Sequence, residues 1–222
     1  MKENEEEDYE EDEIYLVDEN NFSEPTEILK NKLWIGSIQA AKDQKSFEEI
    51  GFTGVLNCSS GIQNYFENST IEYLNITVED KIETNLKEVF EIAHKFINKH
   101  KKVLVHCLGG ASRSVTIIIS YLMKNEKLNL RESYKMIKRK RFIINPNIGF
   151  IKQLMKYEFE LYSIQTINYE EYVTQFFIED LQMKKSELRN YIKKSIQKIG
   201  EEDPNLLFLE ILKLYSLMEI KK

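Results

Sequence analysis

The chain has 222 residues, of which 42% are hydrophobic, and its formal net charge is −6 at pH 7. This length and composition predict one well-packed domain with extensions. The chain has two cysteines, which excludes a disulfide framework and favours a reducing compartment. It shows neither an apolar stretch of membrane-spanning length nor a secretory leader. We therefore expect a cytoplasmic and/or nuclear protein.

The negative charge is concentrated at the start of the chain. Residues 1–13 hold nine acidic residues and one lysine, giving −8, so that the total of −6 leaves +2 for the remainder. Such a block cannot bury apolar surface. We expect residues 1–24 to form a disordered acidic tail.

Strand and helix patterns then alternate along the chain. Strands are predicted at residues 27–35, 54–57, 71–78 and 102–106, and helices at 43–50, 84–97 and 113–123. Thr84 is the expected N-cap of the second helix, and Asn129 with Glu132 forms a capping box that begins another. This alternation predicts an α/β fold, with a central sheet and helices on both sides.

The loop between the last strand and the helix at 113–123 carries the strongest chemical signal. Cys107 and Arg113 enclose the neutral residues Leu108, Gly109, Gly110, Ala111 and Ser112. Main-chain amides at a helix N-terminus bind anions, and cysteines in such positions have pKa values of about 3.5 to 7.5. The arginine can pair bidentately with phosphate, and the glycines permit close approach of the backbone. The sequence therefore predicts a phosphate-binding loop with an ionised nucleophile.

A basic cluster and a helical extension follow this loop. The cluster comprises Lys135, Lys138, Arg139, Lys140 and Arg141, which we interpret as a solvated helix face; docking of acidic phosphosubstrates, in competition with the acidic tail, and nuclear import are alternatives. Residues 164–222 contain three amphipathic helical patterns, at 168–183, 186–199 and from Asp203 onward. They could pack on the domain or mediate binding to a partner or a second copy.

The pattern His106-Cys107-x-x-Gly110-x-x-Arg113-Ser114 resembles the signature of the protein tyrosine phosphatase superfamily, and of its dual-specificity branch in particular. The resemblance covers residues 25–162, and it implies a catalytic domain at 25–163 with a short mixed sheet flanked by helices. It includes Leu33-Trp-Ile-Gly36, Gly54-Val-Leu-Asn57, Ser120-Tyr-Leu-Met123 and Ile144-Asn-Pro-Asn147.

The resemblance also implies roles for individual residues. Cys107 would be the nucleophile, Arg113 and the amides of residues 108–113 would hold the phosphate, and Ser114 would help the sulfur to leave. Asp80, at the end of an alternating strand, would be the general acid, with Glu79 as the alternative and a helix or turn cap as the non-catalytic interpretation. His106 would steady the thiolate or simply be a buried histidine, and Asn147 would brace the loop or cap a helix. No metal or other cofactor is expected.

These residues predict a phosphatase of phosphotyrosine and phosphoserine or phosphothreonine proteins. The chain lacks the Lys-Asn-Arg-Tyr loop of strictly tyrosine-specific relatives, and its neutral phosphate loop does not favour phosphoinositides. A non-catalytic phosphoprotein-binding module and a phosphatase of phosphoinositides or RNA 5′-phosphates are the alternatives. Neither nucleic acid nor a membrane is an expected partner. Cys58 is interpreted as a buried core residue or, alternatively, as a thiol that captures oxidised Cys107.

Overall fold

The computed structural model describes residues 23–67, 70–168 and 172, and these contain a five-stranded sheet of order β1-β2-β5-β3-β4. The strands are β1 (Thr26–Leu29), β2 (Leu33–Gly36), β3 (Gly54–Asn57), β4 (Glu72–Asn75) and β5 (Val103–His106). β1 runs antiparallel to β2 and all other pairs are parallel, so the sheet is mixed, as predicted.

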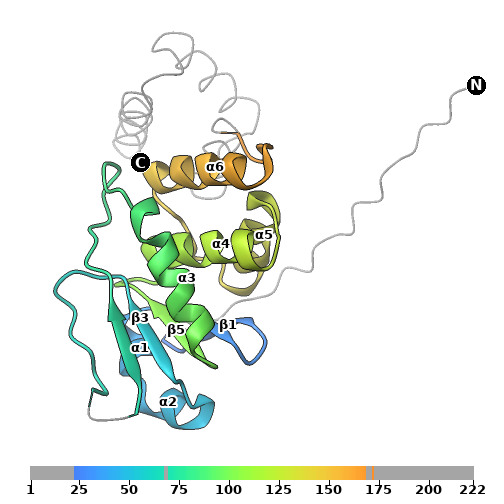
Figure 1. Ribbon diagram of the computed structural model, residues 1–222. Coiled ribbons are helices and arrows are strands. Elements are labelled where there is room, and N and C mark those ends of the chain that lie inside the picture. Colours follow the sequence, from blue (N-terminus) through green and yellow to red (C-terminus); the bar gives the residue numbers. More distant parts are fainter. Residues whose placement is uncertain (1–22, 68–69, 169–171, 173–222) are drawn as a thin grey trace, which may run out of the picture.

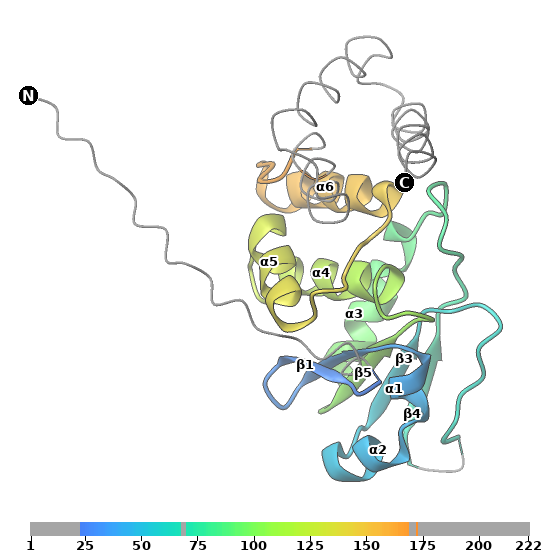
Figure 2. The ribbon, with the colours of Figure 1, turned by 180° about the vertical axis from the view of Figure 1, so that it is seen from behind.

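Helices cover both faces of the sheet because its central strands are apolar on both sides. In β5, Val103 and Val105 face one buried cluster, while Leu104 faces the other. The first cluster is covered by α3 (Phe90–Lys99), α4 (Arg113–Asn125), α5 (Leu130–Lys140) and α6 (Ile148–Tyr162), which Figure 1 shows gathered on one side. The second is covered by α1 (Ile38–Lys42) and α2 (Gln44–Ile50), seen from behind in Figure 2.

Two predicted boundaries in the first half of the domain are wrong. The strand expected at 27–35 is a hairpin, because Asn31 adopts a positive φ of 54° and reverses the chain between β1 and β2. The strand expected at 71–78 is β4 alone. The helix expected at 43–50 is confirmed as α2, whereas α1, which precedes it, was not predicted.

The helix expected from Thr84 begins later. It is the 3-10 turn η1 (Lys87–Val89) followed by α3, and Thr84 is not its cap. The amides of Leu86 and Lys87 instead donate to the Gln153 side chain of α6, at 2.8 and 3.0 Å. A side chain distant in sequence therefore satisfies the donors that a local cap would have taken.

Other local predictions are confirmed. Asn129 and Glu132 form a capping box at the start of α5. Every residue of α4 from Arg113 to Met123 is buried, as its apolar sequence indicates. Of the acidic tail expected at 1–24, residues 1–22 lie outside the described residues. So do the helices expected at 168–183, 186–199 and from Asp203 onward, except for Asn168 and Tyr172.

Candidate active site

The loop from Cys107 to Arg113 joins the carboxyl end of β5 to the N-terminus of α4. Cys107 is 2% exposed, and its Sγ lies 3.2 Å from the Ser114 hydroxyl and 3.2 Å from the Gly110 amide, which donates to it. The predicted nucleophile and Ser114 are therefore in contact. Both donors can stabilise negative charge on the sulfur.

Five consecutive carbonyl groups of this loop accept hydrogen bonds from surrounding donors. They belong to residues 108–112, and their donors are the Ile38 amide (3.0 Å), Arg141 Nη2 (3.4 Å), Arg141 Nε (3.0 Å), the Asn145 amide (2.8 Å) and the Thr116 amide (2.9 Å). In a planar trans peptide the N–H points opposite to the C=O. The amides of residues 109–113 are consequently turned away from these donors, as an anion-binding loop requires.

Glycine is required at one of the two loop positions. Gly110 has a φ of +67°, and a Cβ there would lie 2.6 Å from the Gly36 carbonyl oxygen and 2.7 Å from Arg141 Nη2. A Cβ on Gly109 would meet nothing within 4 Å. The need for a small residue is thus specific to Gly110.

Arg113 is held at the mouth of the loop by the strand ends around it. Its Nη1 donates to the Val78 carbonyl at 3.1 Å, and its Nε lies 3.4 Å from Asp80 Oδ2. Within the described part of the chain this buried Nε has no hydrogen-bond partner. A guanidinium at this position can pair with an oxyanion.

Asp80 points into the site, whereas Glu79 does not. Asp80 Oδ1 accepts from the Ser112 hydroxyl at 2.8 Å and from Asn147 Nδ2 at 2.8 Å. Glu79 is 62% exposed and pairs with Lys81 at 2.7 Å, a contact that lowers the pKa of the Glu79 carboxyl. Of the two candidate acids, the geometry favours Asp80.

Asn147 satisfies both interpretations of its role. It is the N-cap of α6, with its Oδ1 accepting from the Phe150 amide at 3.0 Å, while its Nδ2 reaches Asp80. Its own amide donates to the Ser112 hydroxyl at 3.1 Å. Ser112 caps no amide of α4, because its side chain links Asn147 to Asp80 instead.

His106 lies at the end of β5 and is 1% exposed. Burial lowers the pKa of its imidazole to about 4, and a contact with the Cys107 main chain opposes this shift only in part. The side chain is accordingly a neutral, buried imidazole beside the loop near pH 7.

Arg141 is a site residue that the sequence interpretation assigned wrongly. The basic cluster was expected to be a solvated helix face, but Arg141 is fully buried and supports two loop carbonyls from behind. Leu130, Tyr134 and Ile137 form the buried stripe of α5, and Arg141 follows Ile137 by one turn. That spacing was the available signal that this arginine faces inward.

Cys58 is fully buried and lies beside Cys107. Asn57 and His106 are register partners in the parallel pair β3–β5, and the Cys58 amide donates to the His106 carbonyl at 2.8 Å. The next residues, Cys58 and Cys107, belong to one buried cluster. Burial raises the pKa of the Cys58 thiol well above its usual value, and the negative charge of Cys107 adds to this.

Among the described residues there is no group of three histidine, cysteine or acidic side chains that could hold a metal ion. None of the helices in this part of the chain combines the length and apolarity needed to cross a bilayer.

Comparison with known proteins identifies the family. The model of the dual specificity phosphatase catalytic domain matches residues 33–160. The chain belongs to this family. Human dual specificity protein phosphatase 9 is 38% identical over 139 residues, which are 60% of this chain and 36% of that protein. The chain thus spans about a third of the length of this relative.

Solved structures show the same fold. The crystal structure of DUSP15 is 28% identical, with a TM-score of 0.58, and covers 78% of this chain and 96% of its own. Human tyrosine phosphatase-like serine/threonine/tyrosine-interacting protein is 29% identical, with a TM-score of 0.57, and covers 61% of this chain and 96% of its own. The predicted phosphatase-like architecture of a mixed sheet flanked by helices is confirmed.

Proposed function

We propose that this chain is a protein phosphatase that hydrolyses phosphotyrosine and phosphoserine or phosphothreonine through a cysteinyl-phosphate intermediate. The observation that carries the proposal is the loop around the Cys107 sulfur, in which five successive carbonyls, those of residues 108–112, accept hydrogen bonds from donors outside the loop. It turns the amides of residues 109–113 away from those donors, in the direction from which they can bind the oxygens of one phosphate group. Family membership supports the same reaction class.

In the first step the Cys107 thiolate attacks phosphorus. The loop amides and the Arg113 guanidinium hold the non-bridging oxygens, on which the transition state carries its charge. The bond from phosphorus to the leaving oxygen breaks, and Asp80 gives its proton to that oxygen. The products are the dephosphorylated hydroxyl and Cys107 S-phosphate.

In the second step water attacks phosphorus and Asp80, now a carboxylate, takes a proton from it. The S–P bond breaks and releases phosphate. The Ser114 hydroxyl, 3.2 Å from Sγ, donates to the sulfur as its negative charge returns. The enzyme is regenerated with Cys107 as thiolate and Asp80 protonated.

Specific observations bear on two alternative functions. Similarity to a tyrosine phosphatase-like interacting protein supports a phosphoprotein-binding module, although Cys107, Arg113 and Asp80 are all present here. A phosphoinositide or RNA 5′-phosphate substrate is less supported, because the loop residues 108–112 carry no cationic side chain.

The free cysteines agree with action in the cytoplasm and/or the nucleus.

The test compares wild type with Cys107→Ser, Arg113→Lys and Asp80→Ala, using 4-nitrophenyl phosphate and phosphotyrosine and phosphothreonine peptides. We expect complete loss for the first two variants and a loss of roughly 100-fold for Asp80→Ala. A wild-type chain that binds the peptides without releasing phosphate would establish the binding module instead. Phosphate release from phosphoinositide vesicles alone would establish the lipid substrate.

A further inference from the structure

The segment after α6 folds back onto the domain. Ser163 ends α6 in the left-handed region, with φ 57°, and the chain then turns toward the start of α5. There the fully buried Glu158 carboxylate accepts from the Leu130 amide at 2.7 Å, the Thr166 amide at 2.8 Å and the Thr166 hydroxyl at 2.6 Å. Charge-assisted hydrogen bonds of this kind fix the returning segment against α5.

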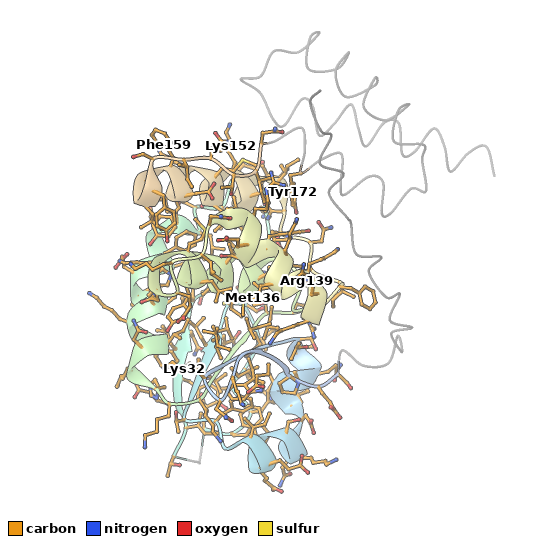
Figure 3. All side chains as sticks on the ribbon, turned by 90° about the vertical axis from the view of Figure 1, so that its right-hand side faces the viewer. Lys32, Met136, Arg139, Lys152, Phe159 and Tyr172 are labelled. Carbon is orange, nitrogen blue, oxygen red and sulfur yellow. The ribbon has the colours of Figure 1, made fainter. Side chains whose placement is uncertain are left out.

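Tyr172 lies at the end of this segment and reaches the loop before α6. It is 6% exposed, and its ring packs edge-on against Tyr134 of α5 with centroids 5.8 Å apart. Its hydroxyl donates to the Pro146 carbonyl at 2.7 Å. Figure 3 shows Tyr172 beside helices α5 and α6.

The group that Tyr172 holds is part of the catalytic network. The Pro146 carbonyl and the Asn147 N–H belong to the same planar peptide unit, and that N–H donates to the Ser112 hydroxyl at 3.1 Å. The Ser112 hydroxyl and Asn147 Nδ2 each donate to Asp80 Oδ1 at 2.8 Å. Fixing the carbonyl end of this peptide therefore fixes the direction of the donor that orients Ser112.

We propose that Tyr172 is a positioning residue for the general acid, acting through the Pro146–Asn147 peptide and Ser112 on the Asp80 carboxyl. The inference rests on the proposed function, in which Asp80 protonates the leaving oxygen. It assigns a catalytic contribution to the first residues of the predicted helical extension at 164–222. Those residues help to orient the acid from outside the segment that the family model matches, 33–160.

A tyrosine that positions the acid and a tyrosine that only stabilises the fold should affect activity differently. Protonation matters most when the leaving oxygen is strongly basic, so a misplaced acid slows phenyl phosphate more than 4-nitrophenyl phosphate. Loss of packing or of phosphate binding would slow both substrates alike. The ratio of the two kcat/KM values therefore reports on the acid alone.

The experiment measures both substrates with the full chain of wild type, Tyr172→Phe, Tyr157→Phe and Asp80→Asn. Tyr172→Phe keeps the ring on Tyr134 and removes one hydroxyl. Tyr157→Phe is the matched control, because its buried hydroxyl has no hydrogen-bond partner among the described residues. Thermal unfolding of each variant verifies that it is folded at the assay temperature.

For Tyr172→Phe we expect a loss of about five-fold with phenyl phosphate, the effect of one hydrogen bond, and less than two-fold with 4-nitrophenyl phosphate. Tyr157→Phe should leave both values unchanged, and Asp80→Asn should show a larger loss with the same preference. Equal losses on both substrates, or a Tyr172→Phe variant that matches the control, would overturn the inference while the Asp80 result stands. An Asp80→Asn variant without leaving-group dependence would instead refute the proposed function.

Discussion

Replacing Arg141 with methionine tests whether the phosphate loop depends on support from behind. The change removes the donors to the Gly110 carbonyl (3.0 Å), the Gly109 carbonyl (3.4 Å) and the Thr26 hydroxyl (3.1 Å), and leaves a shorter, uncharged side chain. Net contributions of such bonds are about 1 kcal/mol each, so we expect a loss of about 3 kcal/mol in the free energy of unfolding. Relief of the buried charge offsets part of this loss.

Activity should fall for a separate reason. Burial lowers the pKa of Arg141 to about 10, and the charge of Cys107 acts in the opposite direction, so the guanidinium keeps its charge near pH 7. Without Arg141, two loop carbonyls lose their donors and the adjoining amides lose their orientation. Removing one oxyanion donor costs about 100-fold in rate or more, and we expect a decrease of that order in kcat/KM for 4-nitrophenyl phosphate.

The assay needs a control for the loss of a cation. Arg139→Met removes the same charge from an exposed position on α5, which Figure 3 labels, and should have little effect. Both variants are compared by kcat/KM, by inhibition with inorganic phosphate and by urea denaturation. If folded Arg141→Met matched Arg139→Met in kcat/KM and phosphate inhibition, the loop would be self-supporting and the reasoning would be wrong.

Three further predictions concern buried residues. Burial lowers the pKa of His94 to about 4, so the neutral imidazole stabilises the fold above pH 6.5. This contribution, up to roughly 3 kcal/mol, is lost as the pH falls toward 4. Between pH 7 and pH 5, urea denaturation should therefore show a smaller decrease in the free energy of unfolding for His94→Gln than for wild type. Gly149→Ala should destabilise the protein by at least about 2 kcal/mol in the same assay, because a Cβ there lies 2.0 Å from the Ile82 carbonyl oxygen, and the stabilisation usual for alanine in a helix would contradict this. Peroxide should oxidise the Cys107 thiolate to a sulfenic acid, and attack by the Cys58 sulfur should then release water and form a disulfide. If mass spectrometry found only sulfinic acid on Cys107 and no disulfide, Cys58 would be a core residue alone.

The sequence predicted the geometry of the candidate site well where that geometry is local. The sulfur, the Gly110 turn and the arginine lie within one strand–loop–helix unit, so their residue types follow from the loop itself. The strand β3 and the capping box of α5 are equally local, and both were predicted at the residues where they occur.

Features that depend on distant contacts were missed. The start of α3 could not be read from Thr84 because Gln153, 67 residues after Leu86, takes the donor that a cap would have satisfied. The role of Arg141 was hidden for a related reason. Four basic residues around it are solvated or partly so, and only the position on the α5 stripe distinguishes the one that is buried.

The two supports of the site come from separate parts of the chain and act on separate groups. Arg141 holds carbonyls of the loop that binds phosphate, whereas Tyr172 holds the peptide that orients Ser112 and, through it, Asp80. Loss of the first should therefore slow good and poor leaving groups by the same factor, because both substrates need phosphate bound and the sulfur ionised. Loss of the second should change their ratio, because only proton delivery is affected. The proposed nucleophile and the proposed acid would then depend on different residues beyond the signature loop. Comparing one good and one poor leaving group would separate the two effects.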